Sequence, residues 1–285
     1  MTSLGLAVHR FRPDALAVAR AVAEWAAERN MKVLADEADL ASIDSPLVVA
    51  GDVSSVDALV SIGGDGTMLR AVRSLNGTAI PIIGVNVGVL GYLANVERES
   101  IIDALTAWHT GTEGTTFHYD DRMLLDVSIW TNGARRANVL ALNEIVIEKK
   151  EAGHTVRLGV DIDRAPFTTY AADGLIIATP TGSTAYSMSA RGPILSPRLR
   201  ALLVTPVSPH MLFDRSMVLD PTETVRVEVL GHREVNVAAD GGLVYSLRPG
   251  DVVEVCAAKE VARFMRFQEQ HFHHVLKSKF GLNDR

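Results

Sequence analysis

A change in the spacing of apolar residues near residue 115 constrains the fold more than any other feature of this sequence. Before it, short apolar runs at residues 4–9, 31–35, 58–62 and 81–85 alternate with segments of helical spacing. Strands that alternate with helices form a parallel sheet with helices on its faces. We therefore predict an α/β domain with a parallel sheet over residues 1–117.

Beyond residue 117 the chain consists mainly of short β-rich segments that Gly, Pro, Asn or Asp separate. These segments are residues 123–130, 137–148, 155–162, 167–170, 175–179, 201–205, 224–229, 235–238 and 252–257. The pattern is typical of an antiparallel sandwich. We predict a β-rich domain over residues 118–266 and a C-terminal helix within residues 267–285. The helix is expected to end at Gly281 and to pack back on the first domain.

Composition excludes several classes of protein. The 285 residues carry a formal net charge of −6 with no dominant basic patch, so a nucleic acid partner is not expected. No apolar run reaches the roughly 18 residues that span a bilayer, and residues 1–10 lack the apolar stretch of a secretion signal. The single cysteine, Cys256, fits a reducing compartment. We expect a cytoplasmic protein without a membrane partner.

The strongest local signal is the turn Gly63-Gly64-Asp65-Gly66-Thr67, which follows a strand and opens a helix. Glycines let the backbone approach a ligand, and the amides of a helix N-terminus attract phosphate. Asp65 does not suit a phosphate clamp, but it suits a general base or a metal partner. The alternative is a tight turn with Asp65 as the N-cap. Neither a Walker A loop nor a GxGxxG fingerprint is present.

Two further polar groups interrupt apolar segments. Asn143 and Glu144 lie inside the apolar run 139–147, where burial is costly without hydrogen bonds unless the pair sits at an edge or strand end. The strand expected over 175–179 runs into the hydroxyl-rich stretch 179–186. This stretch suits sugar hydroxyls and phosphates, a Ser/Thr-capped helix start at 181–183, or both at once. A third signal, the Asp-Gly pair at 240–241, indicates a hairpin.

Together these motifs resemble the NAD kinase family. The resemblance is carried by residues 63–67, 84–93, 143–144, 173–174, 179–186, 189–194, 208–210 and 215, and it covers about residues 59–242 and the C-terminal helix. The glycine turn alone is shared with diacylglycerol kinases, sphingosine kinases and phosphofructokinases. The Asn-Glu pair and residues 179–186 are far more specific to the NAD kinase family.

The resemblance implies an active site between an α/β and a β-rich domain. It also implies phosphoryl transfer to the 2′-hydroxyl of the adenosine ribose of NAD, from ATP or polyphosphate, with a divalent metal ion such as Mg²⁺, in a homodimer or homotetramer. Asp65 is then the base. The residues expected to bind NAD are Asp65, Gly66, Tyr92, Asn143, Glu144, Asp173, Thr181, Thr184, Ala185 and Tyr186.

The residues suggested as contacts of the phosphate donor are Gly63, Gly64, Thr67, Arg10 and Arg191. Arg191 stands where many relatives have glycine, so it contacts donor phosphates, blocks a polyphosphate, or is a solvated surface residue. Residues 9–12 lack the glycine of a His-x-Gly-Arg pattern. The histidines near residue 272 are expected to form a solvated helix face, and we assign no side chain as a metal ligand.

Two other functions stay open from sequence alone. A lipid kinase would share the glycine turn but would not need the Asn143-Glu144 pair. A non-catalytic NAD(P)-sensing protein would keep the binding residues, although the intact Asp65 argues against it.

Overall fold

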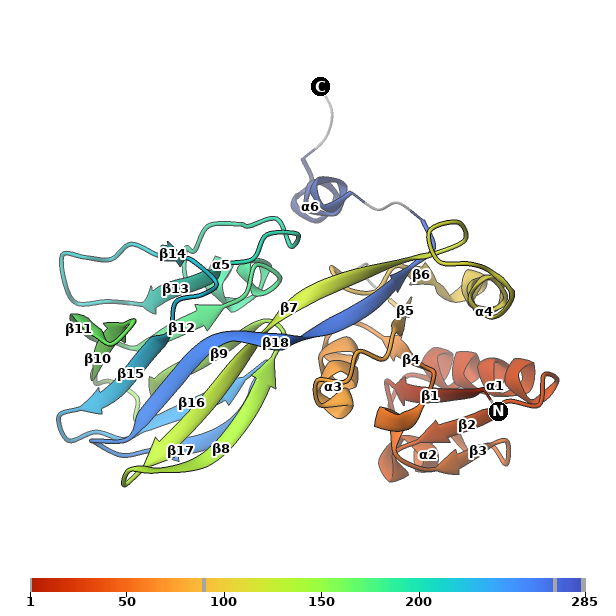
Figure 1. Ribbon diagram of the computed structural model, residues 1–285, viewed down its shortest axis with the longest axis horizontal. Helices are drawn as coiled ribbons and strands as arrows, with labels where there is room; N and C mark the ends of the chain where they lie inside the picture. Colours follow the sequence, from red (N-terminus) through yellow and green to blue (C-terminus); the bar gives the residue numbers. More distant parts are fainter. Residues whose placement is uncertain (1, 89–90, 269–270, 283–285) are drawn as a thin grey trace. The chain divides into compact units, whose positions relative to one another are not determined.

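A computed structural model describes residues 2–88, 91–268 and 271–282 (Figure 1). The chain divides into two compact units, residues 1–121 with 262–285, and residues 122–261. It passes from the first unit to the second within β7 (His118–Thr131) and returns within β18 (Val252–Arg266).

The first unit contains a parallel sheet of order β3-β2-β1-β4-β5. Its strands are β1 (Ser3–Val8), β2 (Lys32–Ala35), β3 (Val48–Ala50), β4 (Ala58–Gly63) and β5 (Ile82–Asn86), with the short β6 (Val96–Glu97) beside β5. The last part of β18 joins β5 in parallel, where Phe264 lies opposite Ile82. The predicted α/β domain with a parallel sheet is confirmed.

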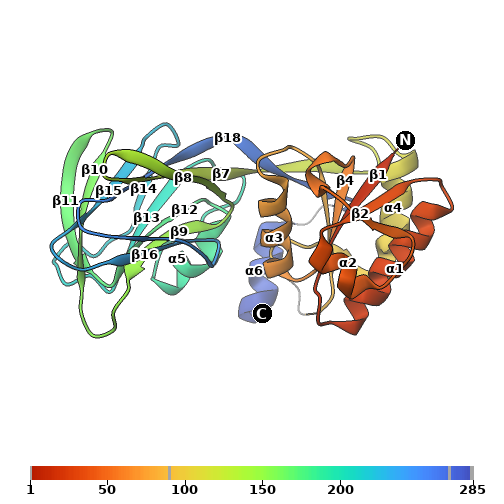
Figure 2. The ribbon, with the colours of Figure 1, turned by 90° about the horizontal axis from the view of Figure 1, so that it is seen from below.

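Helices cover both faces of this sheet (Figure 2). They are α1 (Pro13–Ala27), α2 (Glu37–Ile43), α3 (Asp65–Leu75), α4 (Ile101–Thr110) and the single turns η1 (Val53–Ser55) and η2 (Arg98–Ser100). Helices α1 and α4 share one buried cluster with alternate residues of β4, such as Val60 and Ile62. On the other face, Met68 of α3 packs against Gly84 of β5. This arrangement places the start of α3 at the carboxyl end of β4, where ligands of α/β sheets bind.

The second unit is antiparallel. One layer has the order β11-β10-β15-β18, with β7 beside β18 and β8 beside β7, and the other has the order β14-β13-β12-β9-β16-β17. The strands not yet given are β8 (Ala134–Ala141), β9 (Glu144–Lys149), β10 (Val156–Ile162), β11 (Ala165–Ala172), β12 (Gly174–Ala178), β13 (Leu202–Val207), β14 (Met217–Leu219), β15 (Val225–Leu230), β16 (Val235–Ala239) and β17 (Gly242–Leu247).

Residues from both layers form one buried apolar cluster, in which the inward positions of β15 alternate with half-exposed ones. That alternation is how a sandwich covers a core with half of each strand. The predicted β-rich domain is therefore confirmed. Two short turns, η3 (Gly182–Thr184) and α5 (Tyr186–Ser189), follow β12.

Two local predictions need correction. The single strand predicted over 137–148 is wrong, because β8 ends at Ala141 and β9 begins at Glu144. The strand is interrupted there because the backbone amides of residues 142–144 donate to the Asp240 carboxylate, so they are not available to a continuous β-ladder. The C-terminal helix begins later than predicted: β18 continues to Arg266, α6 spans Phe272–Phe280, and residues 269–270 of the predicted segment lie outside the described residues. Gly281 caps α6 in the left-handed conformation, as predicted.

Membrane-spanning helices are absent from the described part of the chain, since none of its helices is both long and apolar enough to cross a bilayer.

Candidate active site

Asp65 is the first residue of α3, directly after the strand β4 and the N-cap Gly64. Its carboxylate accepts hydrogen bonds from the backbone amides of Tyr92, at 3.0 Å, and Leu93, at 3.1 Å. The alternative interpretation of Asp65 as the N-cap is therefore wrong. A Cβ at Gly91 would overlap the Asp65 carboxylate, so the loop can approach this closely only with glycine there.

A cavity of about 580 Å³ lies in the first unit beside the glycine turn. Its lining residues come from the ends of β1 and β5 and from the start of α3: Val8, His9, Arg10, Phe11, Arg12, Gly64, Gly66, Thr67, Arg70, Asn86, Val87 and Gly88. Three of these are arginines and none is a carboxylate, so the wall carries positive charge. With the partial charge of the α3 N-terminus, this wall suits a polyanion such as a phosphate chain.

Two polar atoms at this cavity have no hydrogen-bond partner among the described residues, His9 Nδ1 and Asn86 Oδ1. Asn86 is only 5% exposed. Buried polar atoms are almost always paired, so an unpaired one at a cavity indicates a place for a ligand atom.

Arg70 was not identified from the sequence. It lies four residues after Gly66 on α3, and residues four apart share one helix face. A basic residue one turn beyond the glycine turn was the signal that could have found it. Arg10, which was predicted as a donor contact, lines the same cavity and forms ion pairs with Asp39 and Asp36. The hydrogen bond to Asp39 chiefly raises the pKa of Arg10 above its usual range.

In the second unit, the Asn143-Glu144 pair and the hydroxyl-rich stretch lie against each other. Thr179 joins them: its amide donates to Asn143 O at 2.9 Å and its hydroxyl donates to Leu142 O at 2.6 Å. The same hydroxyl oxygen accepts the Gly182 amide at 3.1 Å. A Cβ at Gly182 would overlap the carbonyl oxygen of Asn143, so this contact requires glycine.

Glu144 is 6% exposed, and its Oε2 has no partner among the described residues. Burial raises the pKa of Glu144 most, and the charge of Asp240 raises it further, to about 7. A hydrogen bond with the backbone of Tyr186 lowers it by a smaller amount. A carboxyl group with an open acceptor and a displaced pKa is typical of a functional site.

Asp240 is the second residue that sequence reasoning missed as part of the site. The predicted hairpin is confirmed, because β16 and β17 pair on either side of it. Yet its carboxylate also accepts the amides of Leu142, Asn143 and Glu144, at 2.8, 2.7 and 3.2 Å. It thereby shapes the break between β8 and β9 that carries the Asn-Glu pair.

The other predicted residues of this unit surround the hydroxyl-rich turn. Asp173 forms an ion pair with Lys149 at 2.6 Å. The Thr184 hydroxyl donates to Thr181 O at 3.3 Å, and both threonines are buried. Ala185 precedes α5, and Tyr186 is 39% exposed, with its pKa raised by partial burial and by the charges of Glu148 and Asp173.

Arg191 lies just after α5, exposed, in the left-handed conformation with φ of 67°. That backbone conformation explains why glycine would fit the position.

In the first unit, Tyr92 contacts the C-terminal helix, where Lys279 Nζ lies 4.8 Å from the ring centroid.

The described residues contain no group of three or more His, Cys, Asp or Glu side chains that could hold a metal ion. His271, His273 and His274 contact one another at the start of α6, with ring centroids 4.5 to 5.4 Å apart.

A glycine turn that presents a carboxylate at a helix N-terminus, beside a cationic cavity, is the arrangement expected of a phosphotransferase, here in a chain with an α/β and a β-rich unit. Comparison with known proteins makes this more specific. Residues 4–112 match the ATP-NAD kinase N-terminal domain, and residues 142–267 match the ATP-NAD kinase C-terminal domain.

Two relatives match over almost their whole length. The NAD kinase of Syntrophotalea carbinolica is 36% identical over 100% of both chains, and that of Heliobacterium modesticaldum is 36% identical over 98% of each. The chain therefore belongs to the NAD kinase family. It is a phosphotransferase that acts on NAD, and the lipid kinase alternative is not supported.

Two solved structures share the fold. The structure of yeast NADH kinase complexed with NADH matches with a TM-score of 0.90 at 23% identity. The match covers 100% of this chain and 89% of the yeast chain. An NAD kinase from Archaeoglobus fulgidus in complex with ATP has a TM-score of 0.75 at 22% identity, with 100% of both chains covered.

Proposed function

We propose that this enzyme transfers the terminal phosphoryl group of ATP to the 2′-hydroxyl of the adenosine ribose of NAD, with Asp65 as the base. The ribose oxygen forms a bond to the terminal phosphorus while the bond from phosphorus to the bridging oxygen breaks, and ADP leaves. The hydroxyl proton passes to Asp65. One observation supports this role best: two backbone amides fix the Asp65 carboxylate, and each oxygen keeps a lone pair for a hydroxyl.

The cationic cavity is the proposed site for the donor phosphates. Arg10, Gly64 and Thr67 line it, and Gly63 and Arg191 complete the proposed donor contacts. ATP is the donor we favour over polyphosphate, because an NAD kinase of the same fold is known in complex with ATP.

NAD is the proposed ligand of the buried carboxyl and hydroxyl groups of the second unit. Asn143 and Glu144, with Gly66, would bind the adenosine ribose and diphosphate, and Tyr92 would pack by the adenine. The residues proposed for the nicotinamide side and the other ribose are Asp173, Thr181, Thr184, Ala185 and Tyr186. The open Oε2 of Glu144 supports this assignment, since a ribose hydroxyl would satisfy it.

A divalent metal ion, Mg²⁺ by preference, fits this enzyme as an ion that arrives with the triphosphate. The described side chains form no three-ligand cluster, and Mg²⁺ in phosphate-transferring enzymes is commonly held by substrate phosphates and water with one or two carboxylates. The bound ion would neutralise charge on the donor. From the family resemblance and the single cysteine we also propose a cytoplasmic homodimer or homotetramer.

The test is Asp65→Asn, with Asp57→Asn as the matched control. Asp57 is also a carboxylate of the first unit that accepts a backbone amide, that of Ser3 at 2.7 Å. We expect Asp65→Asn to lower turnover by about 10² to 10⁴ while calorimetric NAD binding stays largely intact. Near-normal turnover would refute the base assignment. NADP formation by the unaltered enzyme also separates a kinase from a non-catalytic NAD(P) sensor.

A further inference from the structure

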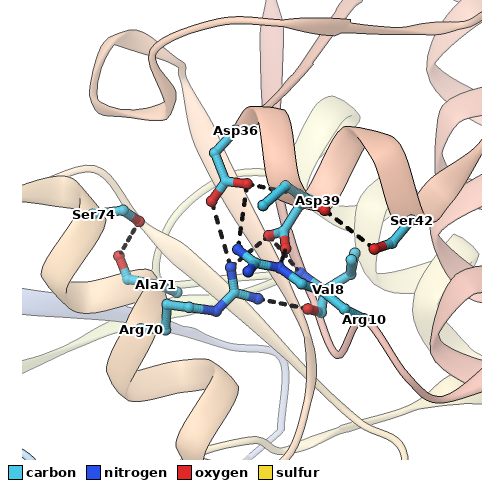
Figure 3. A network of polar contacts seen from close by, with 9 residues as sticks. Val8, Arg10, Asp36, Asp39, Ser42, Arg70, Ala71 and Ser74 are labelled. Carbon is cyan, nitrogen blue, oxygen red and sulfur yellow. Dashed lines mark hydrogen bonds and ion pairs between the residues drawn. The ribbon is translucent and has the colours of Figure 1, made fainter. Parts of the chain in front are cut away.

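Four charged side chains form an Asp–Arg cluster beside the cationic cavity: Arg10, Asp36, Asp39 and Arg70 (Figure 3). Asp39, on α2, accepts a hydrogen bond from Arg10 Nε at 2.6 Å and another from Arg70, on α3, at 2.7 Å. Asp36 lies 3.5 Å from each guanidinium. The cluster therefore joins three elements of the first unit around one carboxylate.

The members of the cluster differ in exposure. The side chain of Asp39 is only 1% exposed, whereas those of Arg10 and Arg70 are 33% and 32% exposed. A buried carboxylate without partners would be strongly destabilising, so Asp39 requires both guanidinium groups in place. Conversely, an arginine side chain loses rotamer freedom when it is fixed on a ligand, and here the ion pairs to Asp39 have already fixed both arginines.

Both arginines keep N–H donors for a ligand. A guanidinium has five donors. Arg10 uses Nε for Asp39 and faces Asp36 with one terminal nitrogen, while Arg70 uses one terminal nitrogen for the carboxylates and the other for Val8 O. Both line the cavity, and neither Asp36 nor Asp39 does. Planar guanidinium groups held this way match phosphate oxygens.

We propose that Asp39, assisted by Asp36, is a positioning residue that holds Arg10 and Arg70 in place for the phosphate groups of a substrate. The inference rests on the proposed function, which supplies two phosphate-bearing substrates, ATP and NAD. The competing explanation is that Asp39 only stabilises the fold by tying β1, α2 and α3 together.

Steady-state kinetics of the full chain separate the two explanations. We expect Asp39→Asn to raise the KM for one phosphate-bearing substrate about tenfold while kcat changes less than about threefold. Asp57→Asn is the control, because Asp57 accepts from the amide and hydroxyl of Ser3 and forms no ion pair within the described ranges. A rise in the KM for ATP agrees with the donor site proposed for this cavity. A rise in the KM for NAD would instead place the NAD diphosphate at the arginines and contradict that donor site, while the positioning role of Asp39 would still hold.

A second variant keeps the test decisive if Asp39→Asn does not fold. Asp36 is the N-cap of α2, where it accepts the Asp39 amide at 2.7 Å. Serine is also a good N-cap, so Asp36→Ser removes the charge and keeps the cap. We expect this variant to raise the same KM about threefold without a loss of melting temperature.

Calorimetric binding of tripolyphosphate to the unaltered enzyme and to Asp36→Ser tests the positioning role without turnover. Weaker binding by the variant supports it even if no NADP is formed, in which case the proposed kinase function alone fails. Unchanged tripolyphosphate affinity together with unchanged KM values in the aspartate variants would overturn the inference.

Discussion

Replacing Glu144 with glutamine should stabilise the protein at neutral and alkaline pH and weaken NAD binding. The physical reason is the pKa of Glu144, which burial and the charge of Asp240 raise from 4.5 to about 7. A displacement of this size costs the ionised form about 3 kcal/mol relative to an exposed carboxyl. Glutamine has nearly the same shape and never carries that charge.

The sign of the effect follows from linkage. Because the folded pKa lies above the unfolded one, the folded protein holds the proton more tightly between pH 4.5 and 7. The free energy of unfolding therefore falls as pH rises through this window. We expect Glu144→Gln to match the unaltered enzyme near pH 4.5 and to exceed it by about 3 kcal/mol at pH 8.

Urea unfolding at several pH values between 4.5 and 8 measures this difference. Glu148→Gln is the matched control, because Glu148 lies on the same strand, β9, but is exposed. We expect it to follow the unaltered enzyme at every pH. If the unfolding free energies of Glu144→Gln and the unaltered enzyme run parallel over the whole range, the buried-charge reasoning is wrong.

The same variant should lose affinity for NAD. An ionised carboxylate accepts hydrogen bonds from ribose hydroxyls more strongly than an amide oxygen does, so we expect the KM for NAD to rise about tenfold. In the unaltered enzyme, NAD affinity should increase as pH rises through about 7, where Glu144 ionises. Gain of stability together with loss of binding is the expected signature of a group kept for function.

Three further changes test other parts of the site. Gly182→Ala would force a Cβ into the Asn143 carbonyl, so we expect a loss of about 3 kcal/mol in urea unfolding and of NAD binding in calorimetry. Asp240→Asn removes the charge that helps to raise the pKa of Glu144, so the pH midpoint of NAD affinity should move downward. Arg191→Gly relieves a left-handed backbone at φ of 67°, so we expect the protein to gain about 1 kcal/mol of stability in thermal unfolding. If this variant uses ATP and polyphosphate in the same ratio as the unaltered enzyme, Arg191 is a solvated residue and not a donor contact.

Sequence patterns predicted the elements far better than they predicted the contacts between them. Strand–helix alternation identified the parallel sheet, and Asp-Gly identified the β16–β17 hairpin, because both signals are local. The bonds of Asp240 to residues 142–144 span 96 to 98 positions, and no local pattern encodes such a pairing. For the same reason the strand break near Asn143 was missed: its apolar flanks read as one continuous strand, and the partner that interrupts the ladder is distant in sequence.

The hydrogen-bond partners of four carboxylates show which of them keep oxygen lone pairs for a substrate. Asp39 is saturated by two arginines and an amide, and Asp240 by three amides. Asp65 receives one amide on each oxygen, which orients it and leaves lone pairs unused. Glu144 alone of the four has an oxygen that is buried without a partner. Since a buried unpaired oxygen is costly, its persistence is best explained by a ligand that supplies the hydrogen bond, and NAD ribose hydroxyls are donors of the right chemistry.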